Sequence, residues 1–229
     1  MTRVLGEELA VDVWDAVAAE LQEAELHMIV NNHVSQAVWC CSPDDGNGWF
    51  DDTYFDVIKW KRSLDFMTRH AKQNWPAATA HSLRNELRIV NLATHDTYGW
   101  SRWYDEMTDA AAIVNAADPD ALVIYSGLNY DHKLNPITAK LPLSETDPRF
   151  FDLADFDYAD KIVFELHTYD NWMTNCTFFQ SKLCSRGFHA LDMSAENYLG
   201  VYAQCLKDFT GDKRIGAASR IEGPIGWLQ

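Results

Sequence analysis

The sequence lacks several patterns that mark common classes of protein. It contains no run of about 18 apolar residues, the length that a membrane-spanning helix needs, and residues 1–12 lack the apolar core of a secretory signal. Neither a Gly-x-Gly-x-x-Gly fingerprint nor a P-loop occurs. Basic residues are few, because 19 Lys and Arg stand against 34 Asp and Glu, for a net charge of −15. We therefore expect neither nucleic acid nor a membrane as a partner.

Cysteine occurs at five positions, but never with the spacing of a metal site. No Cys-x-x-Cys pair is present, so we predict no bound metal and no cofactor. The odd count leaves at least one cysteine unpaired if the others form disulfides. The neighbouring Cys40 and Cys41 are not expected to bond to each other.

Apolar residues are abundant, and their periodicity predicts an α/β fold. The 229 residues, 47% of them hydrophobic and nine of them Trp, suit one domain over residues 1–229. Strand-like runs alternate with amphipathic segments, which predicts parallel strands joined by helices. The predicted strands are 27–30, 79–85, 121–126 and 161–167; the predicted helices are 11–26, 54–72, 100–117, 178–186 and 196–209. Residues 136–151 are predicted as a loop.

Two architectures fit this order, a doubly wound sheet and part of an eight-stranded barrel. The doubly wound sheet should carry a Gly-rich phosphate loop after its first strand, and none occurs. Each predicted strand is instead followed by polar and aromatic residues, which in a barrel would converge at one end. These residues are Asn32-His33, Asn85-Glu86, Asn129-Tyr130 and His167-Thr168-Tyr169.

The pair Asn85-Glu86 is the strongest candidate for chemistry. An amide beside a carboxylic acid at the end of a barrel strand can hold a sugar hydroxyl while the acid protonates a glycosidic oxygen. An ordinary solvated loop with two arginines and a glutamate is the alternative interpretation of the same residues.

Four segments, in order along the chain, resemble the fungal and plant branch of glycoside hydrolase family 5. They are "NNHVSQAVWCCSPDDGNGWFDDTYFD", "SLRNELR", "LVIYSGLNYD" and "KIVFELHTYD". The resemblance implies the third to sixth strands of a (β/α)8 TIM barrel, with their flanking helices, and hydrolysis of O-glycosyl bonds in a β-linked glucan or glycoside. It further implies that Glu86 is the general acid/base. The residues it places against substrate are Asn85, His33, His167 and Tyr169.

The resemblance also has gaps. The family has two earlier strands, one with an active-site Arg, that have no counterpart here, and the motif that carries the nucleophile on the seventh strand is absent. Retaining hydrolysis needs that second carboxylate, and Glu222 is a weak candidate for it. The competing hypothesis is a catalytically inactive fragment with residual carbohydrate binding. The resemblance implies an extracellular location, and an incomplete barrel predicts self-association through exposed strand edges.

Strand parity leads to one further expectation, about charge. Alternate residues of a strand share a face, so Glu165, His167 and Tyr169 should point the same way. Arg84 lies two residues before Glu86. We expect Arg84 and Glu165 to form a buried ion pair beneath the catalytic layer, because neither charge is stable there alone.

Overall fold

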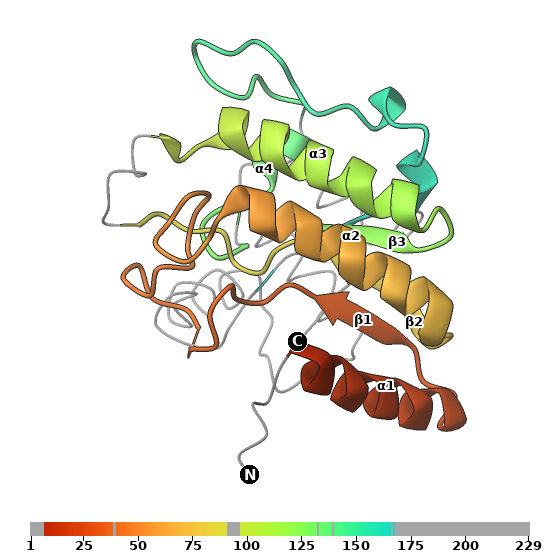
Figure 1. Ribbon diagram of the computed structural model, residues 1–229. Helices are drawn as coiled ribbons and strands as arrows, with labels where there is room; N and C mark the ends of the chain where they lie inside the picture. The colour runs from red at the N-terminus through yellow and green to blue at the C-terminus, as the bar shows by residue number, and fades with distance from the viewer. Residues whose placement is uncertain are drawn as a thin grey trace, which may run out of the picture.

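The computed structural model describes residues 7–38, 40–90, 97–131, 133–138, 140–165 and 167 (Figure 1). Within these ranges four strands alternate with helices. The elements are α1 (Glu7–Glu23), β1 (Met28–Asn31), α2 (Val57–Asn74), β2 (Ala78–Ser82), α3 (Trp100–Ala117), β3 (Leu122–Ser126), α4 (Asn135–Thr138), the 3-10 turns η2 (Leu153–Asp155) and η3 (Ala159–Lys161), and β4 (Ile162–Glu165).

The four strands form one parallel sheet in the order of the chain, β1-β2-β3-β4. This arrangement confirms the predicted α/β class, and a parallel sheet with flanking helices is consistent with an incomplete TIM barrel. The four predicted strands and the first three predicted helices are confirmed, with ends that shift by a few residues. The helices predicted at 178–186 and 196–209 lie outside the described residues.

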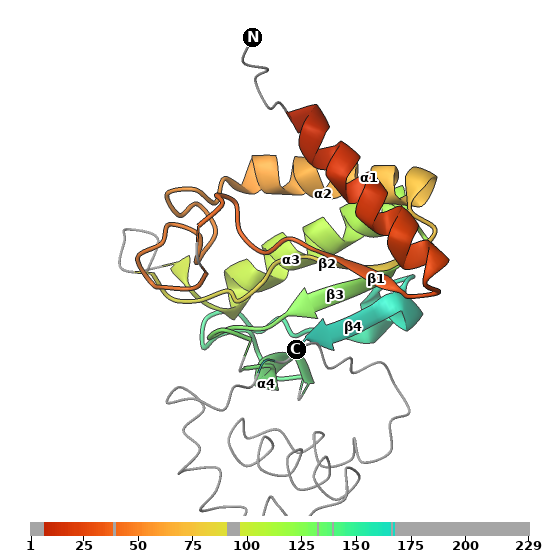
Figure 2. The ribbon, with the colours of Figure 1, turned by 90° about the horizontal axis from the view of Figure 1, so that it is seen from below.

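Helices α2 and α3 cover one face of the sheet, which we call the helix face (Figure 2). The apolar strand residues Val123, Tyr125 and Ile162 lie on this face, and they pack with helix residues such as Trp60 and Trp103. Trp60 and Trp103 also donate indole hydrogen bonds to strand-end carbonyls, at 2.8 and 2.9 Å. The helix layer is thus fixed to the strand ends by directed bonds as well as by apolar burial.

The opposite face of the sheet carries the other residues of each strand. Its apolar layer is a separate cluster that includes Ala80, Ile124 and Val163. Toward the carboxyl ends of the strands this face becomes polar, because β2 ends at Ser82 and, at the ends of β3 and β4, Ser126 pairs in register with Glu165. The polar residues therefore lie at the carboxyl ends of the strands, where ligands bind in parallel α/β folds.

The segment predicted as a loop at 136–151 is not wholly irregular, because the short helix α4 (Asn135–Thr138) overlaps its start. Its single turn is too short to show an apolar period, so sequence reasoning missed it. Self-association through strand edges is tested by nothing in the structure and stays a prediction. Among the described helices, none combines the length and apolarity needed to cross a bilayer.

Candidate active site

The turn after β2 places Glu86 in an unusual backbone conformation. The chain stays attached to its neighbours as the strand ends, since Leu83 N–H donates to the Ile124 carbonyl and Asn85 N–H donates to the Asn32 carbonyl, at 3.0 and 3.1 Å. At Glu86 the backbone then turns left-handed, with φ of 49°. This conformation costs a residue other than glycine about 1–2 kcal/mol, so neighbouring groups must hold it.

Two buried side chains hold the peptide groups on either side of Glu86. Asp131 Oδ2 accepts the Glu86 N–H at 3.0 Å, and Arg88 Nη1 donates to the Glu86 carbonyl at 2.8 Å. Asp131 and Arg88 are 0% and 1% exposed. Charged partners make the stronger kind of hydrogen bond, worth about 1.5–3 kcal/mol each, which is enough to offset the strain of the turn.

The Glu86 carboxylate belongs to a buried hydrogen-bonded network centred on His167. Glu86 Oε1 lies 2.9 Å from His167 Nδ1, and Glu165 Oε1 lies 2.6 Å from His167 Nε2. Ser82 Oγ donates to the other Glu165 oxygen at 2.9 Å. Ser82, Glu86, Glu165 and His167 are all buried, so the network joins the ends of β2 and β4 in a site of low dielectric.

Three carboxylates around one imidazole favour its charged form. Burial alone would lower the pKa of His167, but its hydrogen bonds to Glu165 and Glu86, with the nearby Asp131, raise that pKa to about 10. Complete burial raises the pKa of Asp131 well above its ordinary value, although His167 opposes the rise. At neutral pH the imidazole is therefore a cation that bridges two acids.

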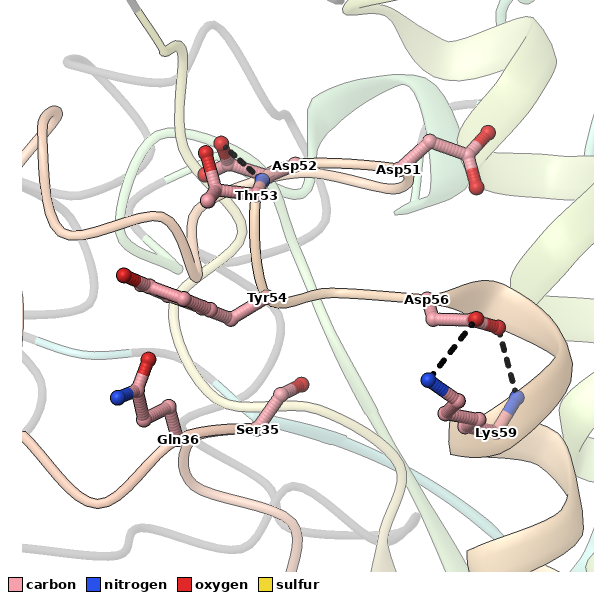
Figure 3. Close-up of a pocket in the computed structure, with 8 residues that line it drawn as sticks. All are labelled: Ser35, Gln36, Asp51, Asp52, Thr53, Tyr54, Asp56 and Lys59. Atoms are coloured by element: carbon pink, nitrogen blue, oxygen red, sulfur yellow. Dashed lines mark hydrogen bonds and ion pairs between the residues drawn. The ribbon is translucent and has the colours of Figure 1, made fainter.

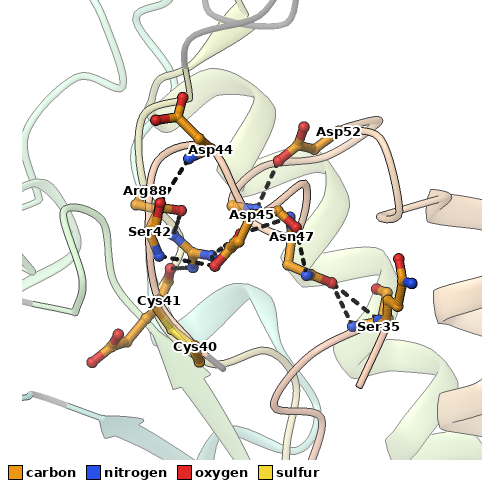
Figure 4. Close-up of polar contacts among 12 residues, drawn as sticks. Ser35, Cys40, Cys41, Ser42, Asp44, Asp45, Asn47, Asp52 and Arg88 are labelled. Atoms are coloured by element: carbon orange, nitrogen blue, oxygen red, sulfur yellow. Dashed lines mark hydrogen bonds and ion pairs between the residues drawn. A yellow bond between two sulfur atoms is a disulfide. The ribbon is translucent and has the colours of Figure 1, made fainter. Parts of the chain in front are cut away.

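Arg88 also ties the loop after β1 to the turn after β2 (Figure 4). Its Nη2 lies 2.6 Å from both carboxylate oxygens of Asp45, and its Nε donates to the Ser42 carbonyl at 2.9 Å. Asp45 in turn accepts backbone N–H groups from Ser42 and Asn47. This buried ion pair, which sequence reasoning missed, brings residues 42–47 against the candidate acid.

The prediction of an ion pair between Arg84 and Glu165 is wrong. Arg84 Nη1 donates to Asn32 Oδ1 and Ser35 Oγ, at 2.7 and 3.0 Å, and its Nη2 donates to the Asn47 carbonyl at 2.8 Å. Its guanidinium also lies 3.8 Å from the centre of the Phe55 ring. Glu165 pairs with His167 instead. Strand parity fails here because β2 ends at Ser82, before Arg84.

Asn85 lies beside the two neighbouring cysteines. Its Nδ2 is 3.6 Å from Sγ of both Cys40 and Cys41. The structure pairs these cysteines with each other (Figure 4), contrary to the expectation that they would not bond. Both side chains turn toward the end of β2, which brings their sulfurs together.

The remaining predicted site residues are not part of this network. His33 is exposed, in the loop after β1, and no hydrogen bond or ion pair joins it to the described part of the network. Its predicted contact with substrate stays a prediction. Tyr169 and Glu222 lie outside the described residues. Sequence reasoning misses Asp131, although it directly follows Asn129-Tyr130, the polar pair after the third predicted strand.

A polar pocket of about 570 Å³ opens within the loop that joins β1 to α2, at the start of α2 (Figure 3). These residues line it: Ser35, Gln36, Asp51, Asp52, Thr53, Tyr54, Asp56 and Lys59. The Asp56 side chain is engaged there as the cap of α2, since it accepts the Lys59 N–H at 3.0 Å. No residue of the His167 network lines this pocket.

One group of possible metal donors lies within the network. Single donor atoms of Asp131, Glu165 and His167 lie within 4.8 Å of one another. Both ring nitrogens of His167 are already hydrogen bonded to carboxylates, at 2.9 and 2.6 Å. We therefore interpret the group as a proton-sharing network rather than a ligand set, and the absence of a metal stays a prediction.

Comparison with known sequences gives one relative of this chain. The chain is 40% identical over 159 residues to a glycosyl hydrolase 5 family protein from Chamaecyparis obtusa. The alignment covers 69% of this chain and 25% of the relative, so the chain spans about a quarter of that protein's length. No family model matches the chain.

Solved structures resemble the fold over nearly the whole chain. The catalytic domain of the major endoglucanase from Xanthomonas campestris pv. campestris is 16% identical, with a TM-score of 0.57 over 97% of this chain and 66% of that one. A hyperthermophilic endocellulase from Pyrococcus horikoshii is 12% identical, with a TM-score of 0.58 over 93% of this chain and 54% of that one. At these identities the likeness shows the fold alone.

Proposed function

We propose, from the premise that this chain is related by sequence to glycoside hydrolase family 5, that it hydrolyses O-glycosyl bonds of a β-linked glucan by a retaining mechanism. Glu86 is the general acid/base of this reaction. Asn85, next to it, holds a sugar hydroxyl beside the scissile bond. Protonation of the glycosidic oxygen by Glu86 lets the leaving sugar depart as an alcohol.

The observation that carries the proposal is the placement of the Glu86 carboxylate. It lies at the carboxyl end of a parallel strand, is 7% exposed, and contacts a buried imidazole at 2.9 Å. A general acid must be fixed in direction and shielded from bulk water, and the two bonds to its peptide groups supply the first of these.

A retaining mechanism also needs a second carboxylate as nucleophile. Glu165 is close to Glu86, but its two oxygens bond to His167 and Ser82. Glu165 contacts the His167 ring nitrogen that does not contact Glu86. It therefore serves as a partner of His167 rather than as a nucleophile. Glu222, the candidate from the sequence, lies outside the described residues.

The second candidate function is an inactive fragment that binds carbohydrate. The observation in its favour is that the nucleophile motif of the family does not occur in this sequence. Solved structures of similar fold give a probe for binding, since the β-glucanase from Saccharophagus degradans was solved with cellotetraose, at a TM-score of 0.50.

One experiment separates these functions. The purified full chain is incubated with a chromogenic β-cellobioside and with soluble cellulose, beside Glu86→Gln and the exposed control Glu145→Gln. Hydrolysis that Glu86→Gln lowers by about 10²–10⁴-fold, and that Glu145→Gln leaves unchanged, supports the proposal. If wild type and Glu86→Gln are equally inert, hydrolysis is excluded, and binding of cellotetraose by calorimetry then decides for the second function.

A further inference from the structure

We infer that Asp131 is a positioning residue that fixes Glu86 and His167 relative to each other. The inference deepens the proposed function, on which its catalytic consequence rests. Asp131 acts through these two residues rather than on substrate. The family resemblance assigned it no role.

The first observation is the contact between Asp131 and the strained turn. Asp131 Oδ2 accepts the Glu86 N–H at 3.0 Å, and the side chain is 0% exposed. The folded state loses stability when a buried N–H has no hydrogen-bond acceptor. The left-handed conformation of Glu86, and with it the direction of the carboxylate, depends on this acceptor.

The second observation is that the Asp131 backbone is bonded to the other side of the network. The Asp131 carbonyl accepts the His167 N–H at 3.2 Å. One residue thus bonds, through its side chain, to the end of β2 and, through its main chain, to the residue that follows β4 by two positions. A shift of Asp131 would move Glu86 and His167 apart.

The third observation is the backbone that delivers Asp131. Asn129, Tyr130 and Asp131 are all left-handed, with φ of 55°, 59° and 58°. Tyr98 Oη accepts the Asn129 N–H at 2.8 Å, and the Leu87 carbonyl accepts the Tyr130 N–H at 3.1 Å. Three such residues in succession are rare outside glycine, and strain of this kind persists where surrounding contacts fix it, often at functional sites.

The Asp131 carboxyl group also lies close to the imidazole. Asp131 Oδ2 lies 3.8 Å from His167 Nδ1. Within the described part of the chain, three acidic groups face His167 from the ends of different strands: Glu86 after β2, Asp131 after β3 and Glu165 on β4. Removing one carboxylate of the three should make the imidazolium easier to deprotonate.

The test uses two substitutions at one position. Asp131→Asn keeps an oxygen that can accept the Glu86 N–H but removes the titratable carboxyl group, whereas Asp131→Ala removes both. Asp120→Asn, in the exposed turn before β3, is the matched control for charge. The readouts are the His167 ring titration by NMR, assigned from its loss in His167→Gln, and the affinity for cellotetraose.

The expected result has two parts. The His167 titration midpoint, about 10 in the wild type, falls in both Asp131 variants and stays in place in Asp120→Asn. Cellotetraose affinity falls by on the order of tenfold or more in Asp131→Ala, while Asp131→Asn retains it within about threefold. A purely structural role would lower stability without moving the titration of His167.

An unchanged His167 midpoint in folded Asp131→Asn would overturn the inference. Equal sugar affinity in folded Asp131→Ala and the wild type would also overturn it. If Asp131→Ala does not fold, the titration in Asp131→Asn decides alone. Failure of the wild type to hydrolyse or bind the sugar would reject the proposed function, and the titration would still test the role of Asp131.

Discussion

Two buried histidines lie on opposite faces of the same sheet and differ in charge, since at neutral pH one ring is neutral and the other is a cation. His81, on β2, pairs in register with Val123 and lies on the helix face, where burial lowers its pKa to about 4. His167, just beyond β4, lies among Glu86, Asp131 and Glu165, which raise its pKa to about 10. Burial lowers the pKa of both rings.

The difference shows that the partners, and not the depth of burial, set the charge of an imidazole here. His81 is 2% exposed and His167 is 8% exposed. The charge of Asp118 raises the pKa of His81, but by too little to offset the effect of burial. Two direct carboxylate bonds reverse the outcome at His167. The helix face is therefore built for packing and the strand ends for holding charge.

The largest effect should come from removing the imidazole on the charged side. In His167→Leu, the carboxylates of Glu86 and Glu165 lose their shared cation in a buried site. We expect the free energy of unfolding at pH 7 to fall by about 3–5 kcal/mol, measured by urea denaturation. Exposed His33→Gln is the control and should change it by less than about 0.5 kcal/mol. An equally small change in His167→Leu would mean that the imidazole adds no net stability.

The same network predicts a loss of stability at high pH. A histidine whose folded pKa lies above its ordinary 6.5 contributes stability that is fully present below 6.5 and is lost as pH rises through about 10. Urea denaturation from pH 6.5 to 10 should show this loss in the wild type and a smaller one in His167→Gln. Parallel curves for the two proteins would contradict the charged state of His167.

On the helix face the pH dependence should have the opposite sign. His81 has a folded pKa of about 4, below its ordinary 6.5, so its contribution is fully present above 6.5 and is lost as pH falls toward 4. The wild type should lose about 3 kcal/mol from this group over that range. His81→Gln should lack this part of the loss, relative to its own stability at pH 7, while His33→Gln should keep it.

Arg88→Lys should weaken the clamp on the turn that carries Glu86. Lysine has one nitrogen and cannot replace all the bonds to Asp45, Ser42 and the Glu86 carbonyl. We expect a loss of about 2 kcal/mol in the free energy of unfolding. Arg62→Lys, on the exposed side of α2, is the matched control. Equal stability of the two variants would show that the clamp is redundant.

The smallest effect should come from the polar link between the two helices. Lys61 on α2 contacts Glu106 and Asp109 on α3, at 2.7 and 2.6 Å. Lys61→Met should lower the free energy of unfolding by at most about 1 kcal/mol, because the pair is partly solvated. Lys59→Met, at an exposed position of the same helix, should change the free energy of unfolding by less than about 0.5 kcal/mol. A larger loss of stability for Lys61→Met would show that ion pairs between α2 and α3 also contribute to the free energy of unfolding.

The helices and strands could be predicted from the sequence because apolar periodicity and helix-ending residues are local features. The helix predicted at 100–117 is found as Trp100–Ala117, and it ends where Asp118 and Pro119 follow. The strand predicted at 121–126 is found as Leu122–Ser126. These segments carry their own pattern, so no knowledge of distant contacts is needed.

The site was only partly predictable because its decisive bonds join distant residues. Glu86 and His167 were both predicted near strand ends, but their contact spans 81 positions. The bond from Glu86 to Asp131 depends on a left-handed backbone at both residues. Asn and Asp adopt that conformation more often than other residues with a side chain, but both are common in other conformations, so their presence does not predict it. The mistaken pairing of Arg84 arose from extending strand alternation past the end of β2.

The left-handed run at 129–131 has a consequence for how the sequence can vary. Valine, isoleucine and threonine are excluded at these positions, because a branched Cβ collides with the backbone there. Glycine would relieve the backbone at Tyr130 but would remove the ring that faces Arg88 at 5.8 Å. We therefore expect few substitutions to be tolerated at residues 129–131. In a saturation library, these three positions should accept fewer amino acids than the exposed positions around them.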